Sequence, residues 1–211
     1  MTAHGSAPEG VHDDVRTRIL DAAERLFYER GIQAVGMDEL RTAAGVSLKR
    51  LYGTFPAKHD LVEAYLRRRD ARWRADLAAY VDAAAGGAAV APADRLLAVF
   101  DWLGRWFAAQ DFRGCAFINA YGELGATSEG VARVTRDHKQ ALRAYLTDLA
   151  RPLGHPDPAT LANQLALLVD GAITAAAISG EPASAHTAHT AHTARTAAAA
   201  LIDSTTTTPN I

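Results

Sequence analysis

Apolar residues recur at intervals of three and four positions along most of the chain, and runs in which apolar and polar residues alternate are nearly absent. A spacing of three and four places side chains on one face of an α-helix, whereas alternation is typical of a β-strand. The pattern therefore predicts an all-α protein. Glycine and proline residues interrupt the apolar stretches and divide the chain into about nine helices.

The N-terminal part of the pattern predicts three helices with short breaks between them. The first ends at Gly31, and glycine is common just after the end of a helix. Two short helices follow, over residues 37–44 and 48–54, and the turn between them contains Gly45 and Ser47. A glycine in so short a turn lets two helices cross at a steep angle, and the serine hydroxyl can accept a hydrogen bond from a backbone N–H in the next helix.

Longer helices account for the rest of the chain. Pro56 ends the third helix, because proline lacks a backbone N–H and clashes with the preceding turn. The remaining expected helices span residues 57 to about 86, 93–109, 115–124, 131–153, 159–179 and 183–202.

Length and composition suggest how these helices are grouped. A chain of 211 residues suits one domain, or a small domain joined to a larger one. With 49% hydrophobic and 22% charged residues, it has the composition of a globular protein and is not disordered throughout. We expect a disordered tail, a small helix-turn-helix domain, a larger helical bundle and a second disordered tail, over residues 1–12, 13–56, 57–203 and 204–211.

The two halves of the chain differ in charge, although the net charge is only −2. The segment Asp14–Ala75 holds 13 Lys and Arg against 9 Asp and Glu, and Asp76–Ile211 holds 9 against 13. A basic end on an acidic body suggests that the two parts meet different partners, one of which could be a polyanion.

The residues around the two short helices make the motif specific. They are Gly31-Ile32-Gln33-Ala34, Met37-Asp38-Glu39-Leu40, Ala43-Ala44-Gly45-Val46-Ser47, Leu51-Tyr52, Phe55, and Lys58 with Leu61. With this pattern in register, the segment from Val15 to Tyr65 resembles the DNA-binding domain of the tetracycline-repressor (TetR) family of bacterial regulators. A second segment, Gly114–Ala120, is similar to one found in many family members. Without these flanks, the two helices would be read as a helical hairpin within a larger bundle.

The chemistry of the third helix suggests how it would read DNA. Lys49 and Arg50, near its N-terminal end, can bond to the O6 and N7 atoms of guanine, and Leu48 can pack on a thymine methyl group. Tyr52 and Lys58 are better placed to hold phosphate groups. The candidate DNA-binding residues are Arg41, Ser47, Leu48, Lys49, Arg50, Tyr52 and Lys58.

The sequence departs from the family pattern in three places, which together cover five positions. Many members have Lys-Gly-Thr or a similar triplet at 48–50, so the operator cannot be inferred from relatives. Gly36 replaces the usual serine or threonine cap, and Arg41 replaces a small alanine and could contact a phosphate or a base. These two differences favour an alternative, a helical dimer that binds or transforms a small molecule and has lost DNA binding; Lys49 and Arg50 argue against it.

For the larger domain, the resemblance implies a homodimer and a pocket for a small-molecule effector. Two equal half-sites on double-stranded DNA also call for a two-fold dimer and a palindromic operator. The candidate dimer-interface residues are apolar and lie on the last two helices: Leu161, Leu165, Leu168, Ala172, Ala176, Ala198 and Leu201. The candidate pocket residues are Trp102, Trp106, Phe107, Phe117, Asn119, Tyr121, Glu123 and His138, although aromatic residues at helical spacing more often belong to the core.

The sequence gives only weak indications of metal binding, redox sensing or catalysis. An Ala-His-Thr repeat places His186, His189 and His192 three residues apart, a spacing that can bind zinc or nickel but can also occur in a helix that packs through its alanines. Cys115 is the only cysteine, which excludes an intramolecular disulfide, and it reads as an inert core thiol rather than a redox sensor. Because no catalytic triad, phosphate-binding glycine loop or zinc-protease motif occurs, we expect neither an enzyme nor a cofactor.

The sequence as a whole predicts a ligand-responsive transcriptional repressor in the bacterial cytoplasm. Residues 1–12 lack the apolar run of a signal peptide, and the charge-free stretches are shorter than the ~20 apolar residues of a spanning helix, so we expect no membrane partner. A ligand that prefers the DNA-incompetent state of the dimer would weaken operator binding by its differential affinity for the two states.

Overall fold

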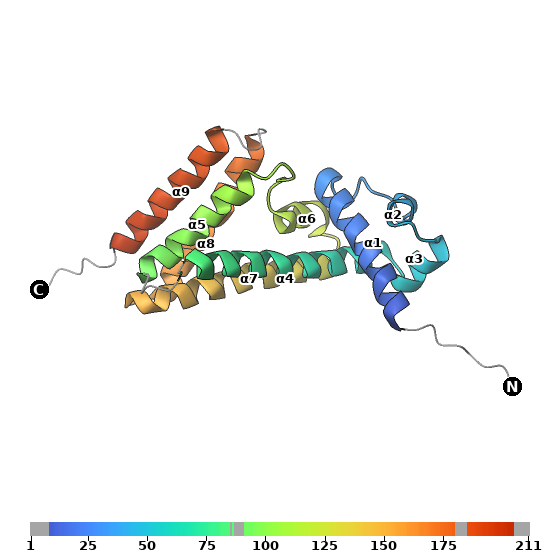
Figure 1. Cartoon of the computed structure of the whole chain (residues 1–211), viewed down its shortest axis with the longest axis horizontal. Coiled ribbons are helices and arrows are strands. Elements are labelled where there is room, and N and C mark those ends of the chain that lie inside the picture. Colours follow the sequence, from blue (N-terminus) through green and yellow to red (C-terminus); the bar gives the residue numbers. More distant parts are fainter. Residues whose placement is uncertain (1–8, 85, 87–90, 180–184, 205–211) are drawn as a thin grey trace, which may run out of the picture. The chain divides into compact units, whose positions relative to one another are not determined.

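In the computed structural model, residues 9–84, 86, 91–179 and 185–204 are described, and these residues form α-helices and one 3₁₀ turn but no strand (Figure 1). The all-α prediction is confirmed. The helices are α1 (Glu9–Arg30), α2 (Met37–Ala44), α3 (Leu48–Thr54), α4 (Lys58–Ala84), α5 (Pro92–Phe107), α6 (Ala116–Leu124), α7 (Glu129–Ala150), α8 (Pro158–Ile178) and α9 (Ala185–Ser204).

The observed limits agree closely with the predicted ones, and the main difference has a simple cause. The seventh helix was expected to reach Leu153, but α7 ends at Ala150 and a 3₁₀ turn covers Arg151–Leu153. Pro152 has no N–H to donate to the carbonyl four residues earlier, so the α-helix cannot continue through it. Gly154, with a φ of +72°, then closes the turn.

The chain divides into two compact units. Unit 1 consists of Met1–Arg69 and Ala116–Thr135, and unit 2 of Asp70–Cys115 and Arg136–Ile211. Helices α4 and α7 therefore contribute residues to both units, and α6 belongs with the first three helices. The parts of the expected tails at 1–8 and 205–211 lie outside the described residues.

Unit 1 is built around α1, which packs against α2 and α3. Ile19 on α1, Leu40 on α2 and Leu51 on α3 are completely buried and form its centre. Gly45 ends α2 in the left-handed region with a φ of +63°, and the N–H of Val46 donates to the carbonyl of Arg41 at 3.1 Å. A residue with a side chain is disfavoured at such a φ, so glycine allows the abrupt turn that separates α2 from α3.

Unit 2 is a bundle in which α5, α8 and α9 pack on one another. The contacts are close because small residues face each other: a Cβ added at Gly104 would lie 3.3 Å from the Cβ of Ala191, and one at Gly114 would lie 2.9 Å from the Cβ of Ala177. Helix α8 is long and apolar enough to cross a membrane by length and composition alone. Eight of its residues, among them Leu161, are buried, as expected for a helix in the core of a bundle, while other apolar side chains of α8 remain open.

Candidate nucleic-acid interface

The turn between α2 and α3 sets the start of the third helix. Ser47 is the N-cap residue of α3, and its hydroxyl accepts a hydrogen bond from the N–H of Arg50 at 3.3 Å. This is the cap expected from the sequence, and it satisfies one of the N–H groups that have no partner inside the helix. Gly36, the N-cap residue of α2, provides no side-chain cap.

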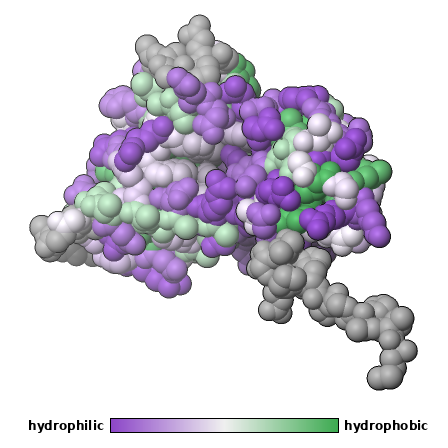
Figure 2. All heavy atoms as spheres, turned by 45° about the vertical axis from the view of Figure 1, so that its right-hand side comes forward, coloured by the Kyte–Doolittle hydropathy of each residue, from purple (hydrophilic) through white to green (hydrophobic). Residues whose placement is uncertain are grey.

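Helix α3 has one buried and one exposed face. Leu51 is completely buried, whereas Leu48 and Tyr52 are 46% and 44% exposed and Lys49 and Arg50 are also exposed. Leu48 and Tyr52 flank the two cations on this face. Figure 2 shows apolar side chains (green) at the surface of this unit among hydrophilic ones (purple). The exposed face thus offers both apolar and cationic groups at the beginning of a helix.

The other two candidate DNA-binding cations have partners within unit 1. The Arg41 Nε atom lies 2.6 Å from Asp38 Oδ1, one turn earlier on α2. Lys58 is half-buried at the start of α4, and its Nζ atom donates to the carbonyl of Ile32 at 2.6 Å. Burial lowers the pKa of Lys58, an effect that the negative charge of Glu123 partly offsets. A phosphate role for Lys58 would not require it to leave this carbonyl, because an ammonium group has three N–H donors.

Arginines at the centre of α4 bind acidic residues of α1. Arg68 contacts Asp21 at 2.6 Å and Glu24 at 2.9 Å, and Arg69 contacts Glu24 at 3.2 Å. Burial alone would lower the pKa of Arg68, but its hydrogen bonds with Glu24 and Asp21 raise it. These side chains therefore neutralise acidic neighbours within the protein.

The candidate pocket residues are divided between the two units. Phe117, Asn119, Tyr121 and Glu123 belong to unit 1, and Trp102, Trp106, Phe107 and His138 to unit 2. The Glu123 carboxylate is engaged by backbone N–H groups of Ile32 and Gln33, some 90 positions earlier in the chain. Ile32 and Gln33 belong to the motif recognised in the sequence, but nothing in the sequence indicates a contact over this separation.

The aromatic candidates of unit 2 pack mainly on each other. The ring of Trp73 lies 5.0 Å from that of Trp102 and 5.9 Å from that of Trp106, measured between centroids. Phe107 is completely buried, and its ring lies 5.0 Å from that of Phe112. Edge-to-face packing of this kind is typical of a hydrophobic core.

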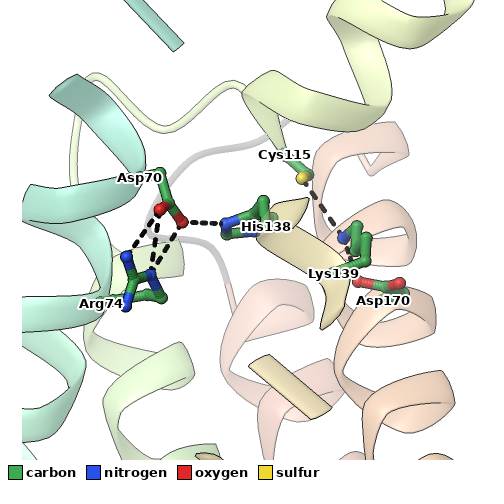
Figure 3. Close-up of polar contacts among 6 residues, drawn as sticks. All are labelled: Asp70, Arg74, Cys115, His138, Lys139 and Asp170. Carbon is green, nitrogen blue, oxygen red and sulfur yellow. Dashed lines mark hydrogen bonds and ion pairs between the residues drawn. The ribbon is translucent and has the colours of Figure 1, made fainter. Parts of the chain in front are cut away.

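His138 is buried beside this cluster and belongs to a polar group with Asp70 and Arg74 (Figure 3). Its Nδ1 atom lies 2.7 Å from Asp70 Oδ1, and Arg74 donates to both oxygens of the same carboxylate at 2.8–3.0 Å. Burial alone would raise the pKa of Asp70, but the hydrogen bonds from His138 and Arg74 lower it to about 2. Burial also lowers the pKa of His138. The histidine is therefore neutral near pH 7 and donates from Nδ1.

A cavity of about 370 Å³ lies beside this group in unit 2. Its lining residues come from α4 and α7: Ala71, Arg74, Ala75, Leu77, Ala78, Ala141, Leu142 and Tyr145. The Tyr145 hydroxyl is buried and makes no hydrogen bond within the described part of the chain, and burial raises its pKa. The cavity is thus mostly apolar, with a guanidinium group and a hydroxyl as its polar groups.

The dimer-interface candidates divide by exposure. Leu161, Leu165, Ala172, Ala176 and Ala198 are buried within the single chain, and Leu168 and Leu201 are partly exposed. Two other side chains of α8 are far more open, Leu167 at 75% and Ile178 at 78%. They lie eleven residues apart, close to three helical turns, and so share one face of the helix.

Neither the histidine repeat nor the cysteine forms a metal site in the described part of the chain. No group of three metal-binding side chains occurs there, and the side chain of His186 lies outside it. Cys115 is buried, with Lys139 Nζ at 3.6 Å from its sulfur, and the same ammonium group lies 2.5 Å from Asp170 (Figure 3).

Comparison with known proteins identifies the family. The profile of bacterial regulatory proteins of the tetR family matches residues 19–65. An uncharacterized HTH-type transcriptional regulator of Mycobacterium tuberculosis is 30% identical over 144 residues, which cover 68% of this chain and 65% of the relative's length. A putative TetR transcriptional regulator of Streptomyces avermitilis is 33% identical with a TM-score of 0.68, over 87% of this chain and 97% of that one. This chain belongs to the TetR family.

The similarity extends through both parts of the TetR-family fold. The TetR-family regulator SCO4454 of Streptomyces coelicolor has a TM-score of 0.79 at 29% identity, over 92% of this chain and 97% of that one. The protein is accordingly a DNA-binding transcriptional regulator and not an enzyme. The matched residues 19–65 include all seven candidate DNA-binding residues, which lie on α2, on α3, in the turn between them and at the beginning of α4.

Proposed function

We propose that this TetR-family regulator is a homodimeric repressor that binds a palindromic operator through α3 and is released by a small-molecule ligand. One observation carries the proposal: the N-terminal part of α3 presents Leu48, Lys49 and Arg50 to solvent. Within the described residues, neither the Lys49 ammonium nor the Arg50 guanidinium makes an ion pair, in contrast to the arginines of α4.

The exposed groups suit the major groove. Arg50 and Lys49 can each donate to a guanine edge, and Leu48 can pack on a thymine methyl group. Tyr52, one turn further along α3, is placed to reach a phosphate oxygen. Arg41 and Lys58 can join them with N–H groups that Asp38 and the Ile32 carbonyl do not use, because a guanidinium group has five donors and an ammonium group three.

The exposed face of α8 supports a dimer. Leu167 and Ile178 lie on a face that the single chain leaves open, and a two-fold partner would bury both copies. Leu168 and Leu201 can add to such an interface. The five buried candidates pack inside the single chain and hold the helices that would form the interface. A two-fold dimer presents two α3 helices to two equal half-sites, which makes the operator a palindrome. A dimer bound to the operator would block other proteins from the same DNA and so repress transcription.

The cavity between α4 and α7 is the effector site that the described residues support. Its volume of about 370 Å³ falls in the range of ligand pockets, and its walls are mostly alanine and leucine. A compact, mostly apolar molecule would suit it. A regulator that binds operators and a small effector would work in the bacterial cytoplasm.

The test is selection of duplexes from a random DNA pool by the purified protein at ~150 mM salt, where nonspecific attraction to phosphates is weakened. We expect an inverted repeat. The double variant Lys49→Ala/Arg50→Ala should lose it, while the control Arg136→Ala/Arg143→Ala removes two exposed cations from α7 and should keep it. Failure to recover a repeat with folded protein, or its retention by the Lys49/Arg50 variant, would contradict base reading by α3.

A further inference from the structure

The connection between α1 and α2 is held by a residue from a distant part of the sequence. Glu123, in the last turn of α6, accepts the N–H of Ile32 on Oε1 at 3.0 Å and the N–H of Gln33 on Oε2 at 2.8 Å. Its own carbonyl accepts the side-chain amide of Gln33 at 2.7 Å. We call these three bonds the Glu123 clamp. Two of them have an ionised acceptor, which makes them stronger than bonds between neutral groups.

The local structure on both sides fits this clamp closely. Gly31 has a φ of +88°, and a Cβ added there would lie 3.2 Å from Glu123 Oε1, so a residue with a side chain would be both strained and crowded. The carbonyl of Ile32 accepts from Lys58 Nζ at 2.6 Å. The N–H and the carbonyl of Ile32 are therefore bonded to side chains from α6 and α4, and the chain has little freedom to move between α1 and α2.

The clamp also explains why α6 clusters with the DNA-binding helices. The segment Ala116–Thr135 belongs to unit 1, while the chain immediately before and after it, at Cys115 and Arg136, belongs to unit 2. Any displacement of α6 by its two chain connections would reach the beginning of α2 through Glu123. Because α2 and α3 share a tight turn, it would then reach α3.

We infer that Glu123 is a positioning residue for operator binding: it joins α6 to the connection between α1 and α2 so that these helices and α3 move as one body. The inference rests on the proposed dimer and palindromic operator. In a dimer, the two α3 helices must match the separation of two half-sites, and the clamp limits how far each α3 can turn relative to α6. Binding to a single half-site uses one α3 helix and does not depend on the separation between two of them.

The test uses the full-length protein with Glu123→Gln, which keeps the size of the side chain but turns an NH₂ group toward a backbone N–H. The control is Asp137→Asn, which removes one negative charge from an exposed position on α7. Amide exchange at Ile32 and Gln33 is measured first. Loss of a hydrogen bond to a charged acceptor predicts exchange that is roughly 10- to 100-fold faster in Glu123→Gln and unchanged in the control.

Affinity is then measured for the full palindrome, for a single half-site, and for a palindrome with one extra base pair between the half-sites. For Glu123→Gln we expect unchanged half-site affinity, affinity for the palindrome reduced by roughly 10-fold, and a smaller preference for the native spacing. A residue that only stabilises the fold of α1–α3 would lower both affinities equally and leave the spacing preference intact. That result would overturn the inference, as would unchanged exchange or an unchanged spacing preference.

A second variant covers the case in which Glu123→Gln does not fold. Gln33→Ala removes only the bond to the Glu123 carbonyl and should change the spacing preference in the same direction by a smaller amount; no change would overturn the inference. If the wild-type protein binds no palindrome, the proposed function fails. The exchange comparison still tests the clamp, since faster exchange in Glu123→Gln supports it and equal exchange refutes it.

Discussion

Replacing Gly114 by alanine should destabilise the protein for two separable reasons. The residue has a φ of +83°, a conformation that costs a residue with a side chain about 1–2 kcal/mol. The new Cβ would also lie 2.9 Å from the Cβ of Ala177, and because Ala177 is exposed we take the lower end, about 1 kcal/mol, of the range typical of overpacking. Alanine recovers about 0.4–1 kcal/mol by restricting the unfolded chain. The sum is a loss of roughly 1–3 kcal/mol in the free energy of unfolding.

Gly154 provides a matched control in the same unit. Its φ is +72°, but a Cβ added there would meet no atom within 4 Å, so Gly154→Ala carries the backbone strain without the crowding. We expect that variant to lose only about 1 kcal/mol. Ala177→Gly in the Gly114→Ala background should restore part of the stability by removing the crowding alone. The assay is urea unfolding at one fixed protein concentration, because association changes the apparent stability. Equal losses for Gly114→Ala and Gly154→Ala would refute the packing argument.

Two further predictions concern the polar groups of unit 2. Tyr145→Phe removes a buried hydroxyl that has no partner within the described residues, so it should leave the protein as stable or about 1 kcal/mol more stable in thermal unfolding, and a clear loss would contradict this. The folded-state pKa values of His138 and Asp70 both lie below their usual ones, so the unfolded chain binds more protons and stability is lost as the pH falls. The contribution of His138 to the free energy of unfolding is fully present above its usual pKa of 6.5 and is lost as the pH falls below that value. That of Asp70, about 2 kcal/mol, is lost between pH 4 and 2. Asp70→Asn should abolish the loss of stability between pH 4 and 2. If the free energy of unfolding falls equally with pH in the variant and the wild type over this range, the assignment to Asp70 is refuted.

The helices could be predicted from the sequence because their limits are set locally. Glycine with a positive φ after α2, the Ser47 cap before α3 and proline near the ends of other helices act over a few residues, so their effects are visible in the one-dimensional pattern. The end of α7 was predicted three residues too late because apolar periodicity continues through Pro152 although the hydrogen bonds cannot.

The site residues were less accessible to prediction because their roles depend on distant partners. Lys58 has the right charge and position for a phosphate contact, yet its ammonium group also donates a hydrogen bond to the carbonyl of Ile32. Glu123 was considered as a pocket residue because it is polar on an apolar helix, while its partners lie about 90 positions earlier. The contact with DNA proposed for exposed residues of α3, such as Lys49, needs no partner within the chain, so the sequence alone was enough to suggest it.

The ion pairs near the middle of α4 restrict how the length of this helix can change. Arg69 binds Glu24 within unit 1, and the next residue, Asp70, binds His138 within unit 2. Each residue of an α-helix advances the direction of its side chains by about 100°, so one residue inserted between them would turn Asp70 well away from its present bearing relative to Arg69. The two ion pairs would then leave the helix in directions that differ from the present ones by about 100°, whereas an exchange of one side chain for another leaves both directions unchanged.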